Sequence, residues 1–161
     1  AVITLKPLTE SNVGIRRVTI ASYQAVSGAG IEALVDLRYQ SQEALMGLGF
    51  TDKEKPQYAF NVTPHIKNEK EKVKKEIPKI LGEFDGEKIL PLDSNVSSIY
   101  ALCVRVPTFY GHGLAMFVDT YHKTSKEEIE NLFKEFNRSC KSEFGGLYSS
   151  PQKTVTLMNE S

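Results

Sequence analysis

Two side chains near the middle of the sequence have the types and the spacing of a small binding or catalytic site. They are the first and last residues of the run Arg105-Val-Pro-Thr-Phe-Tyr-Gly-His112, which lies between two apolar segments. An arginine guanidinium can grip a carboxylate through two parallel hydrogen bonds, and a histidine can move a proton near neutral pH. The pair indicates a site for a small acidic substrate. A structural ion pair for Arg105 and a structural role for His112 are the alternatives that the residues alone leave open.

The segments that must position this pair are residues 97–106 and 113–121, and both have the pattern of strands. The first carries apolar residues on both of its faces, so both faces are expected to be buried. The second is expected to be the return strand, and if the two pair, Arg105 and His112 flank one turn. Cys103 is expected to be a small core residue, because no neighbouring base or helix start would activate its thiol.

The rest of the chain supplies further strands and helices. Residues 15–21 are rich in β-branched side chains and predict a strand, which runs into a segment with two glycines at residues 22–30. That segment predicts either a tight turn or a ligand loop, but its spacing is not GxGxxG. Periodicity predicts helices over residues 31–46 and 67–82, and the second has the Lys/Glu pattern of a solvent-exposed face. Ser125-Lys-Glu-Glu128 is a capping box. It starts a helix whose apolar stripe is expected in the core: Ile129, Leu132, Phe133 and Phe136.

Weaker signals complete the pattern. A helical apolar pattern begins at Ala1 without an N-cap, residues 58–64 are expected to be extended, residues 84–88 predict a turn, and residues 155–158 are at most a short strand. This order predicts an α+β fold, in which helices cover one face of a mixed or antiparallel sheet. Because several strands look apolar on both sides, the other face is expected to form a homodimer.

Composition narrows the class of protein. A length of 161 residues fits one domain, and 20 basic side chains balance 20 acidic ones, which argues against a nucleic-acid or acidic-membrane partner. No apolar run approaches the roughly 20 residues that span a bilayer, and the chain does not open on a leader pattern. Cys103 and Cys140 give neither a disulfide framework nor metal-ligand spacing. A cytoplasmic protein without a metal site is expected.

Three motifs occur in order along the chain: Tyr23-Gln-Ala-Val-Ser-Gly-Ala-Gly30, Phe60-Asn-Val-Thr-Pro-His-Ile66 and Cys103-Val-Arg-Val-Pro-Thr-Phe-Tyr-Gly-His112. Together they resemble the aspartate-β-semialdehyde dehydrogenase family, over nearly the whole chain. The resemblance is to the family's C-terminal, substrate-binding and dimerisation domain, whose fold is similar to the C-terminal domain of glyceraldehyde-3-phosphate dehydrogenase. It implies that residues 1–161 are such a domain, excised from a protein whose N-terminal Rossmann NADP domain and final C-terminal helix lie outside this chain.

The resemblance also implies a reaction. Members of the family reductively dephosphorylate β-aspartyl phosphate to aspartate semialdehyde with NADPH, an oxidoreductase step in lysine, threonine and methionine biosynthesis. It implies that Arg105 holds the α-carboxylate of the small, acidic, amino-acid-derived substrate by a bidentate fork. His112 would be the general acid/base, and Gln24 would orient the acyl-enzyme carbonyl.

Four more residues receive roles from the resemblance. Glu69 and Lys72 match a Glu-x-x-Lys of the family, so Glu69 would meet the substrate amino group and Lys72 the phosphate, which revises the interpretation of residues 67–82 as a purely exposed face. Ser27 and Gly28 would lie near the nicotinamide. NADP is thus implied as a cofactor of the intact parent protein and not of this domain alone.

The sequence departs from the family pattern at two places. The family's catalytic cysteine, in an Asn-Cys-x-Thr motif, would fall just before Ala1, and neither Cys103 nor Cys140 has that context. Gly113 follows the histidine, where active members often carry Ser or Thr.

Two hypotheses follow. The parent is a working dehydrogenase whose isolated domain is inactive, or it is a paralogue that lost the cysteine and acts as a binding or dimerising protein. The joint presence of Gln24, Arg105 and His112 favours the enzyme. The related N-acetyl-glutamyl-phosphate reductase is disfavoured, because the run over residues 23–30 fits it poorly.

Overall fold

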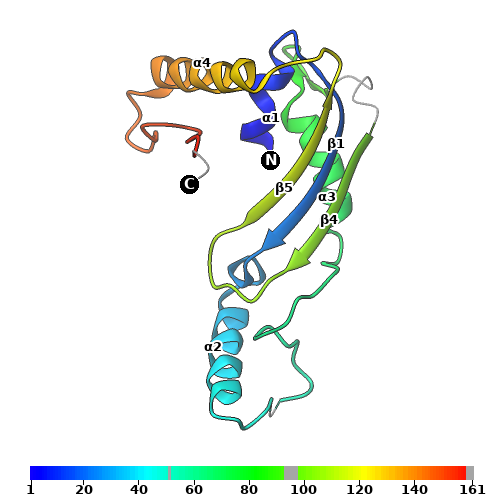
Figure 1. The fold of residues 1–161 in the computed structure, drawn as a ribbon, viewed down its shortest axis with the longest axis vertical. Helices are drawn as coiled ribbons and strands as arrows, with labels where there is room; N and C mark the ends of the chain where they lie inside the picture. Colours follow the sequence, from blue (N-terminus) through cyan, green and yellow to red (C-terminus); the bar gives the residue numbers. More distant parts are fainter. Residues whose placement is uncertain (51, 93–97, 159–161) are drawn as a thin grey trace. The chain divides into compact units, whose positions relative to one another are not determined.

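A mixed three-stranded sheet is the centre of the fold in the computed structural model, which describes residues 1–50, 52–92 and 98–158. Its central strand is β1 (Ile15–Gln24), flanked by β4 (Ser98–Arg105) and β5 (Gly113–Thr120) in the order β4–β1–β5 (Figure 1). The helices and the sheet together confirm the predicted α+β class.

The strand directions follow from the contacts at the strand ends. The N–H of Val106 donates to the carbonyl of Gln24 at 3.0 Å, so β4 and β1 end together and run parallel. The residue after β1 contacts the residue before β5, Ala25 with His112, so β5 runs antiparallel to β1. The expectation that residues 113–121 pair with residues 97–106 is wrong, because β1 lies between the two strands.

Most predicted elements are present with shifted ends. β1 continues past residue 21 to Gln24. The helix expected over residues 67–82 is α3 (Glu69–Ile80), and it begins late because Asn68 has a left-handed φ of 66°, which a right-handed helix does not accept. Residues 155–158 form no strand.

The chain divides into two compact units, which are described separately. Unit 1 contains the described residues of 1–18, 76–98 and 118–161, and unit 2 contains those of 19–75 and 99–117.

In unit 1, helix α4 (Lys126–Phe144) contacts helix α1 (Val2–Thr9). The predicted capping box is confirmed: the Glu128 N–H donates to the Ser125 hydroxyl at 3.2 Å, and the Ser125 N–H donates to the Glu128 carboxylate at 2.7 Å. The expectation that the apolar stripe of α4 is core is wrong for this chain, because no residue of α4 is fully buried. The turn expected at residues 84–88 joins two short antiparallel strands, β2 (Glu83–Phe84) and β3 (Ile89–Leu90).

Unit 2 holds residues 19–24 of β1, 99–105 of β4 and 113–117 of β5. It also holds the 3₁₀ helix η1 (Val26–Ala29) and helix α2 (Ile31–Leu45). The expectation that residues 58–64 are extended is wrong for residues 59–60, which form a turn with a φ of 52° at Phe60. Thr63 then forms an isolated antiparallel bridge with Arg105 at the free edge of β4. A small apolar core ties these pieces together, with Leu34, Phe50 and Tyr58 packed around Val26, Ala33, Leu37 and Ala59.

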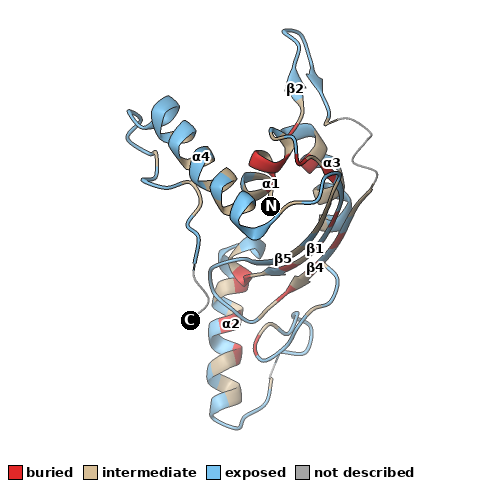
Figure 2. Cartoon of the chain, turned by 45° about the horizontal axis from the view of Figure 1, so that its top comes forward, coloured by how far each residue is buried: buried red, intermediate tan, exposed pale blue. Residues whose placement is uncertain are grey.

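Figure 2 colours each residue by burial, and along β4 buried residues alternate with more exposed ones, so the two faces of the sheet differ in burial. On β4, Ala101 and Cys103 are buried, which confirms the prediction for Cys103. The opposite face is open: Tyr100 is 53%, Leu102 55% and Phe117 of β5 75% exposed. The expectation that both faces of residues 97–106 are buried is therefore wrong within this chain. Among the described helices, none has the length and apolarity to cross a membrane.

Candidate functional site

Arg105 is the last residue of β4, and its side chain is held on the buried face of the sheet. The residue is 9% exposed, and its Nη1 donates to the carbonyl of Ala25 at 2.7 Å. Its backbone N–H and carbonyl both pair with Thr63, at 2.9 and 3.0 Å. A buried guanidinium needs a partner such as the Ala25 carbonyl, because desolvating an unpaired charge is costly. One of its five N–H donors is used by Ala25, and a planar fork of donors remains.

His112 is fixed by the same residue. The N–H of Ala25 donates to Nδ1 of His112 at 3.2 Å. Since Nδ1 accepts this bond, the proton of the neutral imidazole is assigned to Nε2. The side chain of His112 is otherwise exposed, so Nε2 can exchange a proton with a bound molecule.

Gly28 lies where the two side chains meet. A Cβ added there would be 3.0 Å from Nη1 of Arg105 and 3.7 Å from Nε2 of His112. Its helix η1 is held in place by two backbone bonds, from the Val26 N–H to the Thr108 carbonyl at 2.9 Å and from Ser27 to Phe109 at 3.1 Å. The structure thus brings Arg105 and His112 together, across the end of β1 and not through a hairpin.

Gln24 is the last residue of β1 and is half-buried. Its carboxamide Nε2 donates to the Ser22 hydroxyl at 3.2 Å, and its carbonyl accepts the Val106 N–H. Gln24 directly precedes Ala25, the residue to which both Arg105 and His112 are hydrogen-bonded.

Glu69 and Lys72 lie in the first turn of α3 and form an ion pair with each other at 3.6 Å. Backbone hydrogen bonds join the start of the helix to the edge of β4. The N–H of Ile66 donates to the Cys103 carbonyl at 3.2 Å, and the N–H of Glu69 donates to the Ile66 carbonyl at 3.3 Å. Among the hydrogen bonds and ion pairs of the described residues, none joins Glu69 or Lys72 to Arg105 or His112. Their predicted roles stay predictions.

Across residues 1–50, 52–92 and 98–158, no three His, Cys, Asp or Glu side chains gather as metal ligands would. Both cysteines are free, with Cys103 buried and Cys140 half-buried.

Sequence reasoning missed two residues of this region. Ala25 acts through its backbone N–H and carbonyl, and a backbone group leaves no signal in a residue type. Gln40 is a buried amide on α2, 7% exposed. It follows Ala33 and Leu37 at helical spacing on the buried face, and a polar residue in such a stripe is a signal that could have been used.

A family model described as the semialdehyde dehydrogenase dimerisation domain matches residues 5–161. The chain belongs to this family. The match confirms the predicted family and domain type.

Two curated relatives are aspartate-semialdehyde dehydrogenases. The chain is 38% identical to that of Aquifex aeolicus over 136 residues, which cover 83% of this chain and 38% of the relative. It is 35% identical to that of Archaeoglobus fulgidus over 159 residues, which cover 99% of this chain and 38% of the relative. The semialdehyde dehydrogenase domain thus spans about two fifths of the length of these relatives.

Solved structures confirm the fold. Aspartate semialdehyde dehydrogenase II from Vibrio cholerae matches with a TM-score of 0.67 and 31% identity, over 83% of this chain and 39% of that one. The same enzyme complexed with ASA matches with a TM-score of 0.59 and 26% identity, over the same shares of the two chains. The enzyme from Candida albicans with NADP, at 23% identity, shares the fold with a TM-score of 0.65, over 93% of this chain and 36% of that one. The chain therefore has the fold of the C-terminal domain of glyceraldehyde-3-phosphate dehydrogenase, as predicted.

Proposed function

We propose that this chain is the substrate-binding and dimer-forming part of an NADP-dependent aspartate-semialdehyde dehydrogenase. In this proposal the full-length protein converts β-aspartyl phosphate, NADPH and a proton to aspartate semialdehyde, phosphate and NADP⁺. One observation carries the proposal: Arg105 and His112 are held by the same residue and both face Gly28. The two relatives compared above are enzymes with this activity in their names, so the non-catalytic paralogue is not favoured.

Arg105 would bind the α-carboxylate of the substrate. Its guanidinium is buried and already oriented by the Ala25 carbonyl, so little side-chain freedom is lost when a carboxylate binds. The low-dielectric surroundings strengthen a bidentate pair.

His112 would act as the general acid/base at Nε2, because Nδ1 is occupied by the Ala25 N–H. Gln24 would orient the acyl carbonyl with the N–H of its carboxamide that is not directed at Ser22. Both residues flank Ala25, one before it in sequence and one across a hydrogen bond.

Glu69 and Lys72 would meet the substrate amino group and the phosphate, and their ion pair would open to do so. Ser27 and Gly28 would lie beside the nicotinamide. Gly28 is exposed, and its bare backbone would let a flat ring approach. NADPH supplies the hydride.

The attacking thiolate and the nucleotide domain are proposed to lie in the parent protein outside residues 1–161. Cys103 is buried, and Cys140 is on α4, in the other unit from Arg105 and His112. This domain alone would therefore not catalyse the reaction.

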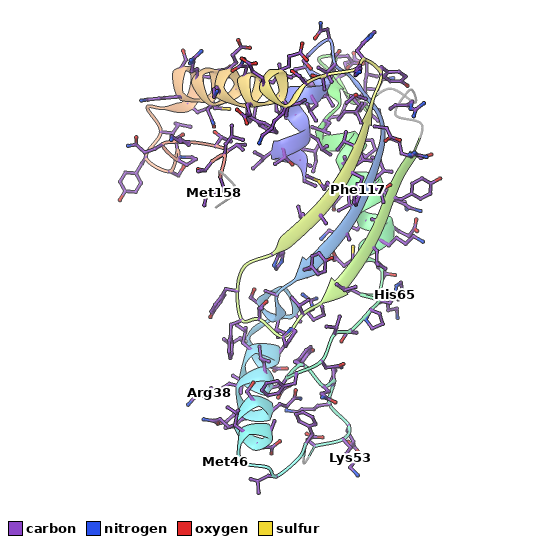
Figure 3. All side chains as sticks on the ribbon, viewed as in Figure 1. Arg38, Met46, Lys53, His65, Phe117 and Met158 are labelled. Atoms are coloured by element: carbon purple, nitrogen blue, oxygen red, sulfur yellow. The ribbon has the colours of Figure 1, made fainter. Side chains whose placement is uncertain are left out.

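The homodimer is proposed to form through the open face of the sheet. Tyr100, Leu102 and Phe117 project from it, and Figure 3 labels Phe117 on β5. Exposed apolar side chains of this kind are typical of an interface, and the family model describes a dimerisation domain.

The function is tested in the full-length protein with aspartate semialdehyde, phosphate and NADP⁺, by following NADPH formation. Arg105→Ala should mainly raise the KM for aspartate semialdehyde, and His112→Ala should mainly lower kcat. Unchanged kinetics in both variants would refute the assignment of the site.

A further inference from the structure

Gln40 is a buried amide whose hydrogen-bonding groups are used on one stretch of backbone. Its Oε1 accepts from the N–H groups of Tyr58 at 2.7 Å and Ala59 at 3.1 Å, and its Nε2 donates to the Pro56 carbonyl at 2.9 Å. In the described part of the chain, the other buried polar or charged residues are Ser22 and Arg105, at the ends of β1 and β4. A buried amide with three good bonds specifies one arrangement of its partners.

The stretch that Gln40 holds would otherwise be poorly fixed. The described residues from 52 to 57 are exposed, and Ala59 is the first fully buried residue after them, packed in the core with Val26 and Leu37. A surface ion pair between Lys55 and Asp36, at 2.7 Å, also joins this loop to α2. Because Lys55 is half exposed, that pair is screened by water and fixes the loop weakly.

The held stretch leads directly to the site. Phe60 has a left-handed φ of 52°, which a phenylalanine adopts only when its neighbours fix it. Thr63 then pairs with both backbone groups of Arg105, and Ile66 pairs with Cys103 three residues before Glu69. The stretch that bonds to β4 at Thr63 and Ile66 is thus held at its other end by the Gln40 carboxamide.

We infer that Gln40 is a positioning residue for the carboxylate grip of Arg105. It touches no reacting atom and acts through residues 56–63, whose register sets the edge on which Arg105 ends. The inference rests on the proposed function, because the effect on substrate binding presumes the role of Arg105.

The test compares Gln40→Leu with Gln42→Leu in the full-length protein. Gln42 is the matched control, because it is the same residue type on the same helix and is exposed. Gln40→Leu should raise the KM for aspartate semialdehyde about five- to twentyfold, with kcat and the KM for NADP⁺ within about twofold of wild type. Gln42→Leu should match wild type. A Gln40→Leu protein that melts at a lower temperature with an unchanged KM would show a merely structural role and overturn the inference.

Gln40→Glu gives a rescue that depends on pH. A protonated carboxyl offers an acceptor to Tyr58 and Ala59 and an O–H donor to Pro56, whereas the ionised form places a charge against the Pro56 carbonyl. Charged residues on the same helix and the adjoining loop include Asp36, Glu43 and Lys55, and a Gln42→Glu control corrects for them. The ratio of variant to wild-type KM should be smallest at the acidic end of the pH range in which the enzyme is active. It should rise with pH as the introduced carboxyl ionises, because the charge then lies against the Pro56 carbonyl. If Gln40→Leu does not fold, a flat ratio in this series overturns the inference.

Amide hydrogen exchange at Tyr58, Ala59 and Arg105 gives a readout that does not need catalysis. All three amides should exchange faster in Gln40→Leu and at the wild-type rate in Gln42→Leu. If the wild-type protein does not act on aspartate semialdehyde, the proposed function fails, and exchange at Arg105 then decides whether Gln40 holds this edge. Unchanged exchange at Arg105 would overturn the inference in either case.

Discussion

Replacing Gly28 by alanine asks whether Arg105 and His112 act at one site, because the added methyl group would enter the space they share. The new Cβ would be 3.0 Å from Nη1 of Arg105, while ordinary contact begins at 3.4 Å, so 3.4 − 3.0 leaves about 0.4 Å to be made by movement. His112 is already at 3.7 Å and need not move. The perturbation therefore falls on the guanidinium.

The guanidinium cannot move without cost. Arg105 is 9% exposed, and its bond to the Ala25 carbonyl would lengthen from 2.7 Å by about 0.4 Å, to the long end of normal hydrogen bonds. Since a misplacement of about 1 Å can cost about 100-fold in rate, we expect a five- to tenfold loss of kcat/KM, which is about 1 to 1.4 kcal/mol. The loss should appear in the KM for aspartate semialdehyde. Stability should change by less than about 1 kcal/mol, because alanine also restricts the unfolded chain.

The assay is steady-state kinetics in the full-length protein, with Gly146→Ala as the control. A Cβ at Gly146 meets no atom within 4 Å, so that variant should match wild type. The double variant with Arg105→Lys should lose less than the sum of the two single losses, because both changes act on one contact. A fall in kcat at constant KM, or strict additivity, would refute the reasoning that the methyl group acts through the carboxylate grip.

Five further substitutions test the site, the proposed dimer and unit 1. In single-turnover experiments, which separate chemistry from binding, His112→Ala should slow the chemical step by about 100- to 10,000-fold, whereas Arg105→Ala should weaken binding of aspartate semialdehyde by a few kcal/mol. Phe117→Asp should convert the proposed dimer of two 18.0 kDa chains to a monomer by light scattering, and a wild-type chain that is itself monomeric at micromolar concentration would contradict the sheet-face interface. Ser125→Ala should lower the free energy of unfolding by about 1 kcal/mol through loss of the α4 cap; an unchanged melting temperature would mean that the cap contributes nothing. The N–H of Ser125 lowers the pKa of Glu128 from 4.5, so its contribution is present above about pH 4.5 and is lost as the pH falls through the folded-state pKa; stability of Glu128→Gln should then depend less on pH in that acidic range, and identical acid titrations would refute this.

The sequence predicted individual elements better than their arrangement. Local patterns mark β1, β4 and β5 because each strand carries its own β-branched and apolar residues. The pairing of β4 with β1 joins segments far apart in sequence, and no local pattern records it. The assumed hairpin of β4 and β5 followed the rule that consecutive strands pair, and that rule failed here.

The sequence showed which faces are apolar, but it did not show whether this chain itself buries them. The stripe of α4 and the outer face of β4 are apolar, as expected, yet Phe136, Tyr100 and Leu102 are not fully buried in this chain. An apolar pattern shows which face needs cover, but the cover can come from another part of the protein or from a second copy.

The site shows the same division. Arg105 and His112 could be picked from the sequence because their side chains carry recognisable chemistry. The residue that joins them could not, because Ala25 contributes a backbone N–H to one and a backbone carbonyl to the other. Gln40 left a visible signal, a polar residue in a buried helical stripe, but its partners are backbone groups eighteen and nineteen residues away.

This use of one backbone residue has a consequence for specificity. Ala25 is fully buried at the start of η1. Because the guanidinium of Arg105 and the imidazole of His112 are both hydrogen-bonded to this one residue, the distance between the two groups is fixed. In the proposed roles, one group holds the substrate's carboxylate and the other moves a proton at its reacting carbonyl. The distance between them then selects the number of carbons between those two groups, because a longer acid gripped at Arg105 would carry its carbonyl past Nε2 of His112. Discrimination against such substrates should therefore appear in kcat and not in binding, since the grip itself is unchanged.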